Sequence, residues 1–139
     1  MTSLVMDTTV AMAAVLPERH SEAARQVLLR VADTGAIVPP IWHLEIGNIL
    51  LAAERRGLLD AARRDEILKH LGGLPISVDE AMAGRAWGAI LALARDYGLA
   101  LHDAAYLELA LRRGVMLASF DAALRRAAVV AGAMGAAEG

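Results

Sequence analysis

Residues 4–9 read Leu-Val-Met-Asp-Thr-Thr, and an Ala- and Val-rich segment follows as far as Leu16. A short apolar run before a residue that favours helix N-caps predicts a buried strand that gives way to a helix. The same order recurs at residues 117–121, Leu-Ala-Ser-Phe-Asp, just before Ala-Ala-Leu. The two stretches predict two strand–helix units of an α/β fold.

The rest of the chain also alternates between strands and helices, with Pro17, Pro39-Pro40, Asp60 and several glycines as boundaries. Strands that alternate with helices predict a central parallel sheet covered on both faces. At 139 residues we expect one domain, residues 1–139, with a frayed tail from about residue 131. We expect strands near 4–6, 36–38, 76–78 and 115–118, and the apolar residues before Asp103 also indicate a place where a strand gives way to a helix. We expect helices near 9–16, 20–34, 40–56, 60–72, 80–97, 103–113 and from 121 onward.

Three aspartates follow apolar stretches at the ends of expected strands. Asp7 and Asp121 end the two stretches quoted above, and Asp103 follows Leu-Ala-Leu-His at 99–102 and is expected to open a helix. The carboxyl ends of parallel strands lie on one edge of the sheet, where ligands bind. If the first and last strands are neighbours, Asp7 and Asp121 meet there, within reach of Asp103.

Glu45 is the fourth notable acid, because it lies within an otherwise apolar helical stretch. Helical periodicity assigns Ile46, Ile49, Leu50 and Ala53 to the core stripe of this helix. Glu45 and Asn48 fall on a separate stripe beside it, which directs a carboxylate and an amide toward the boundary of the core.

Each aspartate, taken singly, is well explained as a helix N-cap. Asp79 also follows an expected strand, and we interpret it as a cap and exclude it from the site. Glu45 has no such explanation, since it lies inside a helix.

Carboxylates that gather beside core segments repel one another and resist ionisation unless a cation compensates. Mg²⁺ or Mn²⁺ prefers oxygen ligands and can activate water for attack on a phosphodiester. Zinc is disfavoured, because the chain has no cysteine and its histidines lack a zinc-binding spacing. Those histidines are His20, His43, His70 and His102.

Composition favours a cytoplasmic protein, with no membrane-spanning stretch and no signal peptide. The formal net charge of −2 does not suggest a nucleic-acid binder. Arginine is nevertheless suited to phosphate contacts. Among the Arg-Arg pairs of the chain, those at 55–56 and 112–113 are better explained as helix C-termini, because glycine follows each. Arg-Arg pairs occur at 55–56, 63–64, 112–113 and 125–126.

The ordered set of motifs resembles the PIN domain family of metal-dependent ribonucleases, in particular the VapC-type toxins of toxin–antitoxin pairs. The resemblance extends from Leu4 to about Val130. The matching segments are Leu-Val-Met-Asp7-Thr-Thr, Pro-Pro-x₄-Glu45-x-x-Asn48, Asp103-Ala-Ala-Tyr-Leu and Ala-Ser119-Phe-Asp121.

The resemblance implies a three-layer α/β/α sandwich and an endoribonuclease that hydrolyses RNA phosphodiester bonds. The acids that would bind Mg²⁺ or Mn²⁺ and carry catalysis are Asp7, Glu45, Asp103 and Asp121. Thr9, Ser119 and Asn48 match supporting polar positions of the family.

The resemblance also implies a homodimer and a cognate antitoxin whose C-terminal segment lies along a groove of the toxin. Ile49, Leu50, Leu58 and Leu59 are candidates to line such a groove. The alternative is that these residues belong to the core.

Two features depart from the family pattern. The family often ends with another short strand, and residues 131–139 contain no convincing one. His102 lies beside Asp103, where the family varies. A general-acid role for His102 is weakly supported, because a metal-bound water needs no such help.

Three other functions stay open. One is a PIN nuclease of RNA or DNA processing that is not a toxin, and another is a metal- or protein-binding module without catalysis. The third is a phosphoacceptor receiver domain. Such a domain needs a lysine after a late strand, and the only lysine, Lys69, falls in a helix before the third strand.

Overall fold

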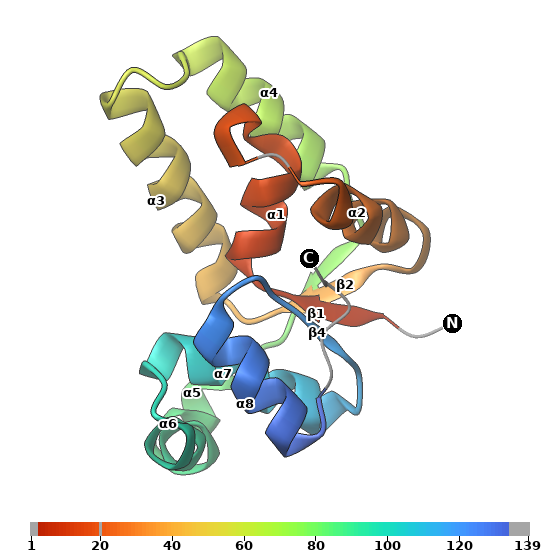
Figure 1. The fold of residues 1–139 in the computed structure, drawn as a ribbon, viewed down its shortest axis with the longest axis vertical. Coiled ribbons are helices and arrows are strands. Elements are labelled where there is room, and N and C mark those ends of the chain that lie inside the picture. Colours follow the sequence, from red (N-terminus) through yellow and green to blue (C-terminus); the bar gives the residue numbers. More distant parts are fainter. Residues whose placement is uncertain (1–2, 20, 134–139) are drawn as a thin grey trace.

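The structure is a computed structural model that describes residues 3–19 and 21–133 (Figure 1). The expected helix start at His20 and the expected frayed tail beyond Ala133 lie outside these residues. The strands are β1 (Leu4–Met6), β2 (Ala36–Val38), β3 (Ile76–Val78) and β4 (Leu117–Ala118). The helices are α1 (Thr8–Val15), η1 (Pro17–Arg19), α2 (Glu22–Thr34), α3 (Ile41–Arg55), α4 (Ala61–Gly72), α5 (Met82–Arg85), η2 (Ala86–Ile90), α6 (Leu91–Tyr97), α7 (Leu101–Arg113) and α8 (Ala122–Ala131).

The four strands form one parallel sheet in the order β3-β2-β1-β4. The first and last strands are neighbours, which is the condition for Asp7 and Asp121 to meet, because Val5 pairs with Leu117 and Met6 pairs with Ala118. The backbone N–H of Asp7 continues this ladder by donating to the Ala118 carbonyl at 3.1 Å. The ends of β1 and β4 are therefore held side by side.

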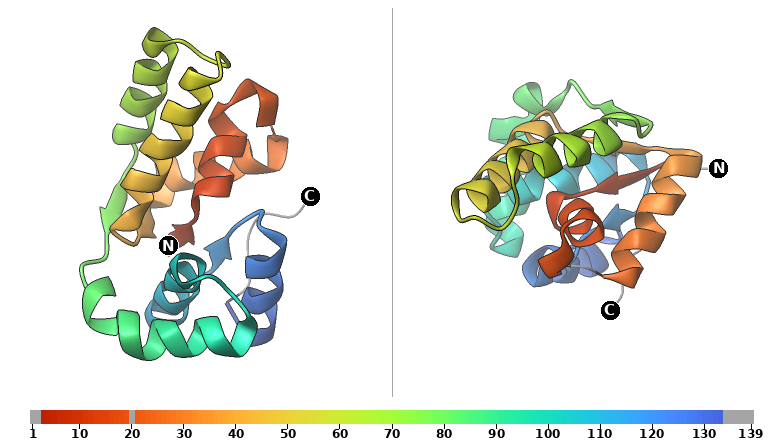
Figure 2. Two further views of the ribbon diagram at one scale, coloured as in Figure 1. Left: turned by 90° about the vertical axis from the view of Figure 1, so that its left-hand side faces the viewer. Right: turned by 90° about the horizontal axis from the view of Figure 1, so that it is seen from above.

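Helices cover both faces of the sheet, as the sequence predicts for an α/β/α sandwich. Helices α1 to α4 lie on one side, and α5, α6, α7 and α8 lie on the other (Figures 1 and 2). The chain moves outward from β1 to β2 and β3 and then returns to β4 on the opposite side of β1. The direction of winding changes between β1 and β4, which is where doubly wound sheets bind ligands.

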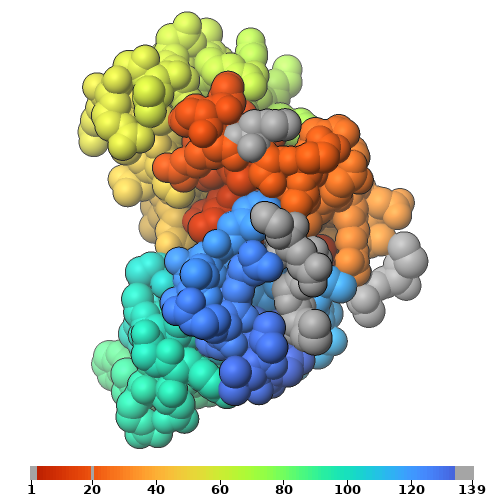
Figure 3. All heavy atoms as spheres, viewed as in Figure 1, coloured from red at the N-terminus to blue at the C-terminus, as the bar shows by residue number. Residues whose placement is uncertain are grey.

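The core lies around β1, whose three residues are fully buried. Helix α1 contributes Val10 and Met12 from one side, and α7 contributes Leu107 and Leu109 from the other. A space-filling view shows the C-terminal helices packed directly against the N-terminal elements (Figure 3). Within the described residues, no helix is long and apolar enough to cross a membrane.

Two predicted boundaries are wrong. Leu99 and Ala100 form no strand, and α7 begins at Leu101 with Ala100 as its N-cap, so Asp103 lies inside the first turn. Gly98, with φ of 65°, ends α6 so close to this point that no strand can form between the two helices.

The helix expected over residues 80–97 is also divided. It consists of α5, the π-helical turn η2 and α6, and it begins at Met82. Gly84 and Gly88 lie in this segment, where glycine weakens a regular helix. A π turn is a recognised local interruption of that kind.

Candidate active site

Asp7 lies at the carboxyl end of β1 and is the N-cap of α1. Its Oδ1 accepts hydrogen bonds from Thr9 N (3.1 Å), Thr9 Oγ1 (2.6 Å) and Val10 N (3.4 Å). Its Oδ2 accepts one from Ser119 Oγ at 2.5 Å. The cap interpretation is therefore correct for Asp7, but it accounts for only one of the two oxygens.

The electrostatic environment of Asp7 is unusual for a helix cap. The residue is 4% exposed, and burial raises the pKa of Asp7 from 3.8 to about 6. The hydrogen bonds from Ser119 and Thr9 lower the pKa but do not offset the loss of hydration. No described Lys or Arg side chain forms an ion pair with Asp7, so a cation at this point would relieve a real energetic cost.

Ser119 joins the ends of β4 and β1. It is buried, donates to Asp7, and accepts a hydrogen bond from Asp121 N at 3.0 Å. Thr9 Oγ1 accepts from Phe120 N at 2.8 Å, which ties the same turn to α1 from the other side. The two supporting hydroxyls thus hold the Asp7 and Asp121 backbone segments in a fixed relation.

Asp121 is the N-cap of α8, and its Oδ2 accepts from Leu124 N at 2.9 Å. Asp103 lies in the first turn of α7. Burial raises the pKa of Asp103 above its ordinary value, the adjacent His102 lowers it, and the negative charge of Asp121 raises it further. The two carboxylates therefore influence each other's charge.

Glu45 projects from α3 and reaches α7. Its Oε1 accepts a hydrogen bond of 2.6 Å from the hydroxyl of Tyr106, which is 2% exposed. Burial raises the pKa of Tyr106 well above its ordinary range, and the bond to Glu45 adds to the rise. The negative charges of Asp7 and Asp103 contribute to the rise as well, so the Tyr106 hydroxyl is influenced by three of the four acids.

Sequence reasoning did not assign a role to Tyr106, although the residue is part of the quoted Asp103-Ala-Ala-Tyr motif. The available signal was the spacing of three residues between Asp103 and Tyr106, because residues three apart share one face of a helix. Asn48 is exposed, and its side chain makes no hydrogen bond to any other described residue. The supporting role that the family resemblance implies for Asn48 therefore has no hydrogen bond to Glu45 behind it.

The four acids share one region, but they are not in a closed arrangement. Across residues 3–19 and 21–133, no three His, Asp or Glu side chains converge as ligands of a single ion. Mg²⁺ commonly keeps several of its waters and binds directly to only one or two carboxylates. An open group of oxygen donors is compatible with that mode of binding.

Asp79 belongs to a separate ion-pair cluster, and the interpretation of Asp79 as a simple helix cap is incomplete. It accepts from Ala81 N at 3.3 Å, but Arg112 binds both carboxylate oxygens at 3.1 and 2.7 Å, and Arg113 adds a bond of 3.1 Å. The Arg112 guanidinium holds the pKa of Asp79 at about 2. This acid is compensated within the chain, unlike Asp7, so excluding it from the site agrees with the structure.

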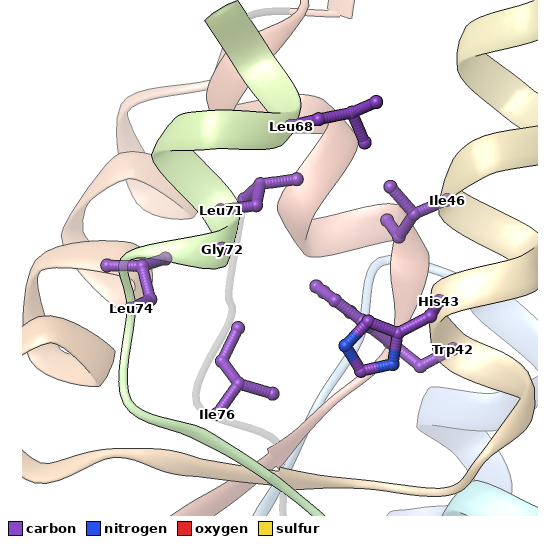
Figure 4. Close-up of a pocket in the computed structure, with 8 residues that line it drawn as sticks. All are labelled: Trp42, His43, Ile46, Leu68, Leu71, Gly72, Leu74 and Ile76. Carbon is purple, nitrogen blue, oxygen red and sulfur yellow. The ribbon is translucent and has the colours of Figure 1, made fainter. Parts of the chain in front are cut away.

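A pocket of 130 Å³ lies elsewhere, between α3, α4 and the start of β3 (Figure 4). Apolar side chains dominate its lining, together with the imidazole of His43. None of the four acids lines it. Buried Trp42 also lines it, and its Nε1 has no acceptor among the described residues. The pocket offers no carboxylates and is distinct from the acidic edge of the sheet.

Comparison with known proteins agrees with this geometry. The family model described as "PIN domain" matches residues 4–130. The chain belongs to the PIN domain family. PIN domains are nucleases that act on nucleic acid, and they generally use divalent metals. Membership of this family therefore implies that the chain is a nuclease.

A solved structure, PAE2754 from Pyrobaculum aerophilum, is similar in fold to this PIN domain. The TM-score is 0.68 at 22% sequence identity, and the match covers 91% of this chain and 79% of the other. At this identity the similarity supports the fold alone. Among curated proteins, no significant sequence match was found.

The donor set of this PIN domain fits a hard divalent cation. All candidate ligands are carboxylate oxygens, and the buried Asp7 lacks a protein cation to compensate its charge. His102 offers a nitrogen beside this set, since its Nε2 lies 3.5 Å from Asp103 Oδ1. Oxygen donors alone favour Mg²⁺ or Mn²⁺ over zinc.

Proposed function

We propose that this PIN domain is a Mg²⁺- or Mn²⁺-dependent endoribonuclease with Asp7, Glu45, Asp103 and Asp121 as its catalytic and metal-binding residues. The observation that carries the proposal is the environment of Asp7. This carboxyl group is buried, has a pKa raised to about 6, and is hydrogen-bonded to the segment that ends in Asp121. A carboxylate that only caps a helix would not need to be buried where the winding of the sheet changes direction, between β1 and β4.

The roles follow from the positions of the side chains. A bound divalent ion would polarise the phosphodiester and lower the pKa of a water that attacks it. Asp7 and Asp121 supply carboxylate oxygens from the adjacent ends of β1 and β4. Thr9 and Ser119 hold Asp7 in one orientation through their hydroxyl groups. Asp103 and Glu45 border the same space from α7 and α3.

Arg125 and Arg126 support a nucleic-acid substrate close to this site. They are the fourth and fifth residues of α8, whose N-cap is Asp121, and Arg126 is exposed. Neither forms an ion pair with another described residue, in contrast to Arg112 and Arg113. Arginines on the helix that Asp121 caps can contact phosphate groups of a nucleic acid bound at this site.

We further propose that the enzyme is the toxin of a type II toxin–antitoxin pair and acts in the cytoplasm as a homodimer. Exposed leucines on and after α3 support contact with another protein, since Leu44 is 77% exposed, Leu51 36% and Leu58 51%. Leu50, in contrast, is fully buried and belongs to the core. An adjacent gene for a small DNA-binding protein that forms a complex with this chain would support the toxin function over a processing nuclease.

Substrate and ion can be tested together on purified wild-type protein. We expect cleavage of single-stranded RNA with Mg²⁺ or Mn²⁺, no cleavage with EDTA, and little cleavage of DNA of the same sequence. Mapping the cut sites on total cellular RNA would then define the target. RNA that stays intact while Mg²⁺ raises the melting temperature would indicate a binding module and contradict the proposal.

A further inference from the structure

Tyr106 connects two helices that carry candidate acids. Its ring is buried in α7, and its hydroxyl donates to Glu45 Oε1 of α3 at 2.6 Å across a sequence separation of 61 residues. The other oxygen, Oε2, accepts no hydrogen bond from a described residue. One oxygen of Glu45 is therefore fixed, and the other is available.

The position of Tyr106 on α7 places this bond next to the other acids. Asp103 and Tyr106 are three residues apart, so they share a face of the helix. A glutamate side chain has several rotatable bonds, and fixing it costs conformational entropy. Partners of this kind commonly orient the carboxylates that bind metal ions.

We infer that Tyr106 is a positioning residue for Glu45. Its hydroxyl holds Oε1 and so presents Oε2 to the divalent ion of the active site. The inference rests on the proposed function, because it assumes that Glu45 contributes to metal binding. The role assigned to Tyr106 runs through its hydrogen bond to Glu45 Oε1 and needs no contact between Tyr106 and the ion.

The direct test is the affinity for Mn²⁺, measured by calorimetry on the full chain. Tyr106→Phe removes the hydroxyl and keeps the ring, and we expect affinity to fall roughly 10- to 100-fold. Tyr97→Phe is the matched control, because Tyr97 lies on α6 and makes no side-chain hydrogen bond to a described residue. It should bind Mn²⁺ like the wild type.

A double-mutant cycle shows whether Tyr106 acts through Glu45. Glu45→Ala should weaken Mn²⁺ binding, and adding Tyr106→Phe to that variant should weaken it no further. A full additional loss in the double variant would contradict a positioning role. Equal Mn²⁺ affinity of Tyr106→Phe and wild type would overturn the inference and leave the proposed function intact. Absence of Mn²⁺ binding by the wild type would overturn both.

A spectroscopic readout is independent of metal and does not require the Tyr106 variant to fold. The chain contains two tyrosines, Tyr97 and Tyr106, so protein labelled with ¹³Cζ-tyrosine gives two NMR signals. In metal-free protein, Glu45→Ala should shift the Tyr106 signal and leave the Tyr97 signal in place. Tyr97→Phe provides the assignment. An unshifted Tyr106 signal in Glu45→Ala would overturn the inference.

Discussion

Ser119 Oγ lies 2.5 Å from Asp7 Oδ2, although 112 residues separate the two in the sequence. The contact exists because β4 pairs with β1, which brings the ends of both strands together. It joins the first and last candidate acids through one buried hydroxyl, since Ser119 also accepts from Asp121 N. The proposed active site is therefore assembled by the topology of the sheet.

Ser119→Ala should destabilise the protein by about 1–3 kcal/mol, because it leaves buried polar groups of Asp7 and Asp121 without a partner. Urea unfolding would measure the change. Ser77→Ala is the control, since Ser77 is exposed on β3 and makes no side-chain hydrogen bond to a described residue. Equal stability of the two variants would contradict a structural role for the Ser119 hydroxyl.

The same substitution should move the pH dependence of cleavage. The hydrogen bond from Ser119 lowers the pKa of Asp7, so its removal raises that pKa further above about 6. We expect the acidic limb of the pH–rate profile of Ser119→Ala to shift to higher pH. An unshifted limb would show that Asp7 does not limit activity at low pH.

Asp7→Asn should stabilise the metal-free protein at pH 7.5 by about 2 kcal/mol. The folded-state pKa of about 6 lies above the unfolded value of 3.8, so the native state holds the proton more tightly. Wild-type stability therefore falls as the pH rises from about 4 to about 6 and stays low above that range. Asparagine removes this charge.

Thermal unfolding in EDTA at pH 4.5 and pH 7.5 would test this. The gain of Asp7→Asn over wild type should be larger at pH 7.5. Asp60→Asn is a matched N-cap control, because Asp60 caps α4 but is exposed. A similar pH-dependent gain in Asp60→Asn would show that the effect does not come from the burial of Asp7.

Mg²⁺ should raise the melting temperature of the wild type more at pH 7.5 than at pH 5. Protons and metal ions compete for the same carboxylate of Asp7, so binding weakens as Asp7 becomes protonated. A melting series in MgCl₂ at both pH values would measure this. The same rise at both pH values, or an undiminished rise in Asp7→Asn, would place the binding site elsewhere.

Arg112→Ala should destabilise the protein by about 3 kcal/mol or more, because two buried carboxylates lose the guanidinium that pairs with both of them. These carboxylates belong to Asp79 and Glu108, and both residues are 4% exposed. Arg113→Ala should cost less than about 1 kcal/mol, since that side chain is 47% exposed and makes a single contact with Asp79. Urea unfolding of the two variants would reveal the difference, and equal losses would contradict this assignment.

Much of the fold could be predicted from local sequence signals. Apolar runs that end in cap residues located β1 and β4 closely, and Gly35, Gly57 and Gly114 mark helix ends that the structure contains. Alternation of strands and helices predicted the parallel sheet. These features depend on interactions between residues near in sequence, which periodicity and capping describe well.

Several features that depend on distant contacts were not predicted. The sequence shows that Asp79 follows a strand, but only the tertiary structure brings Arg112 to it. The bond between Tyr106 and Glu45 likewise needs α3 and α7 to be placed relative to each other. Only Leu99 and Ala100 lie between Gly98 and the start of α7, which is too few residues for a strand before Asp103. Their apolar side chains are nevertheless typical of a strand.

The most direct test of the proposed active site is the rate of RNA cleavage in Mg²⁺ by Asp121→Asn and by Asp60→Asn. Each substitution replaces a helix N-cap aspartate with asparagine, which is itself a good cap, so both proteins should fold. We predict that Asp121→Asn loses at least about 100-fold in rate, whereas Asp60→Asn cleaves like the wild type. Wild-type cleavage by Asp121→Asn, in preparations free of other nucleases, would contradict the account.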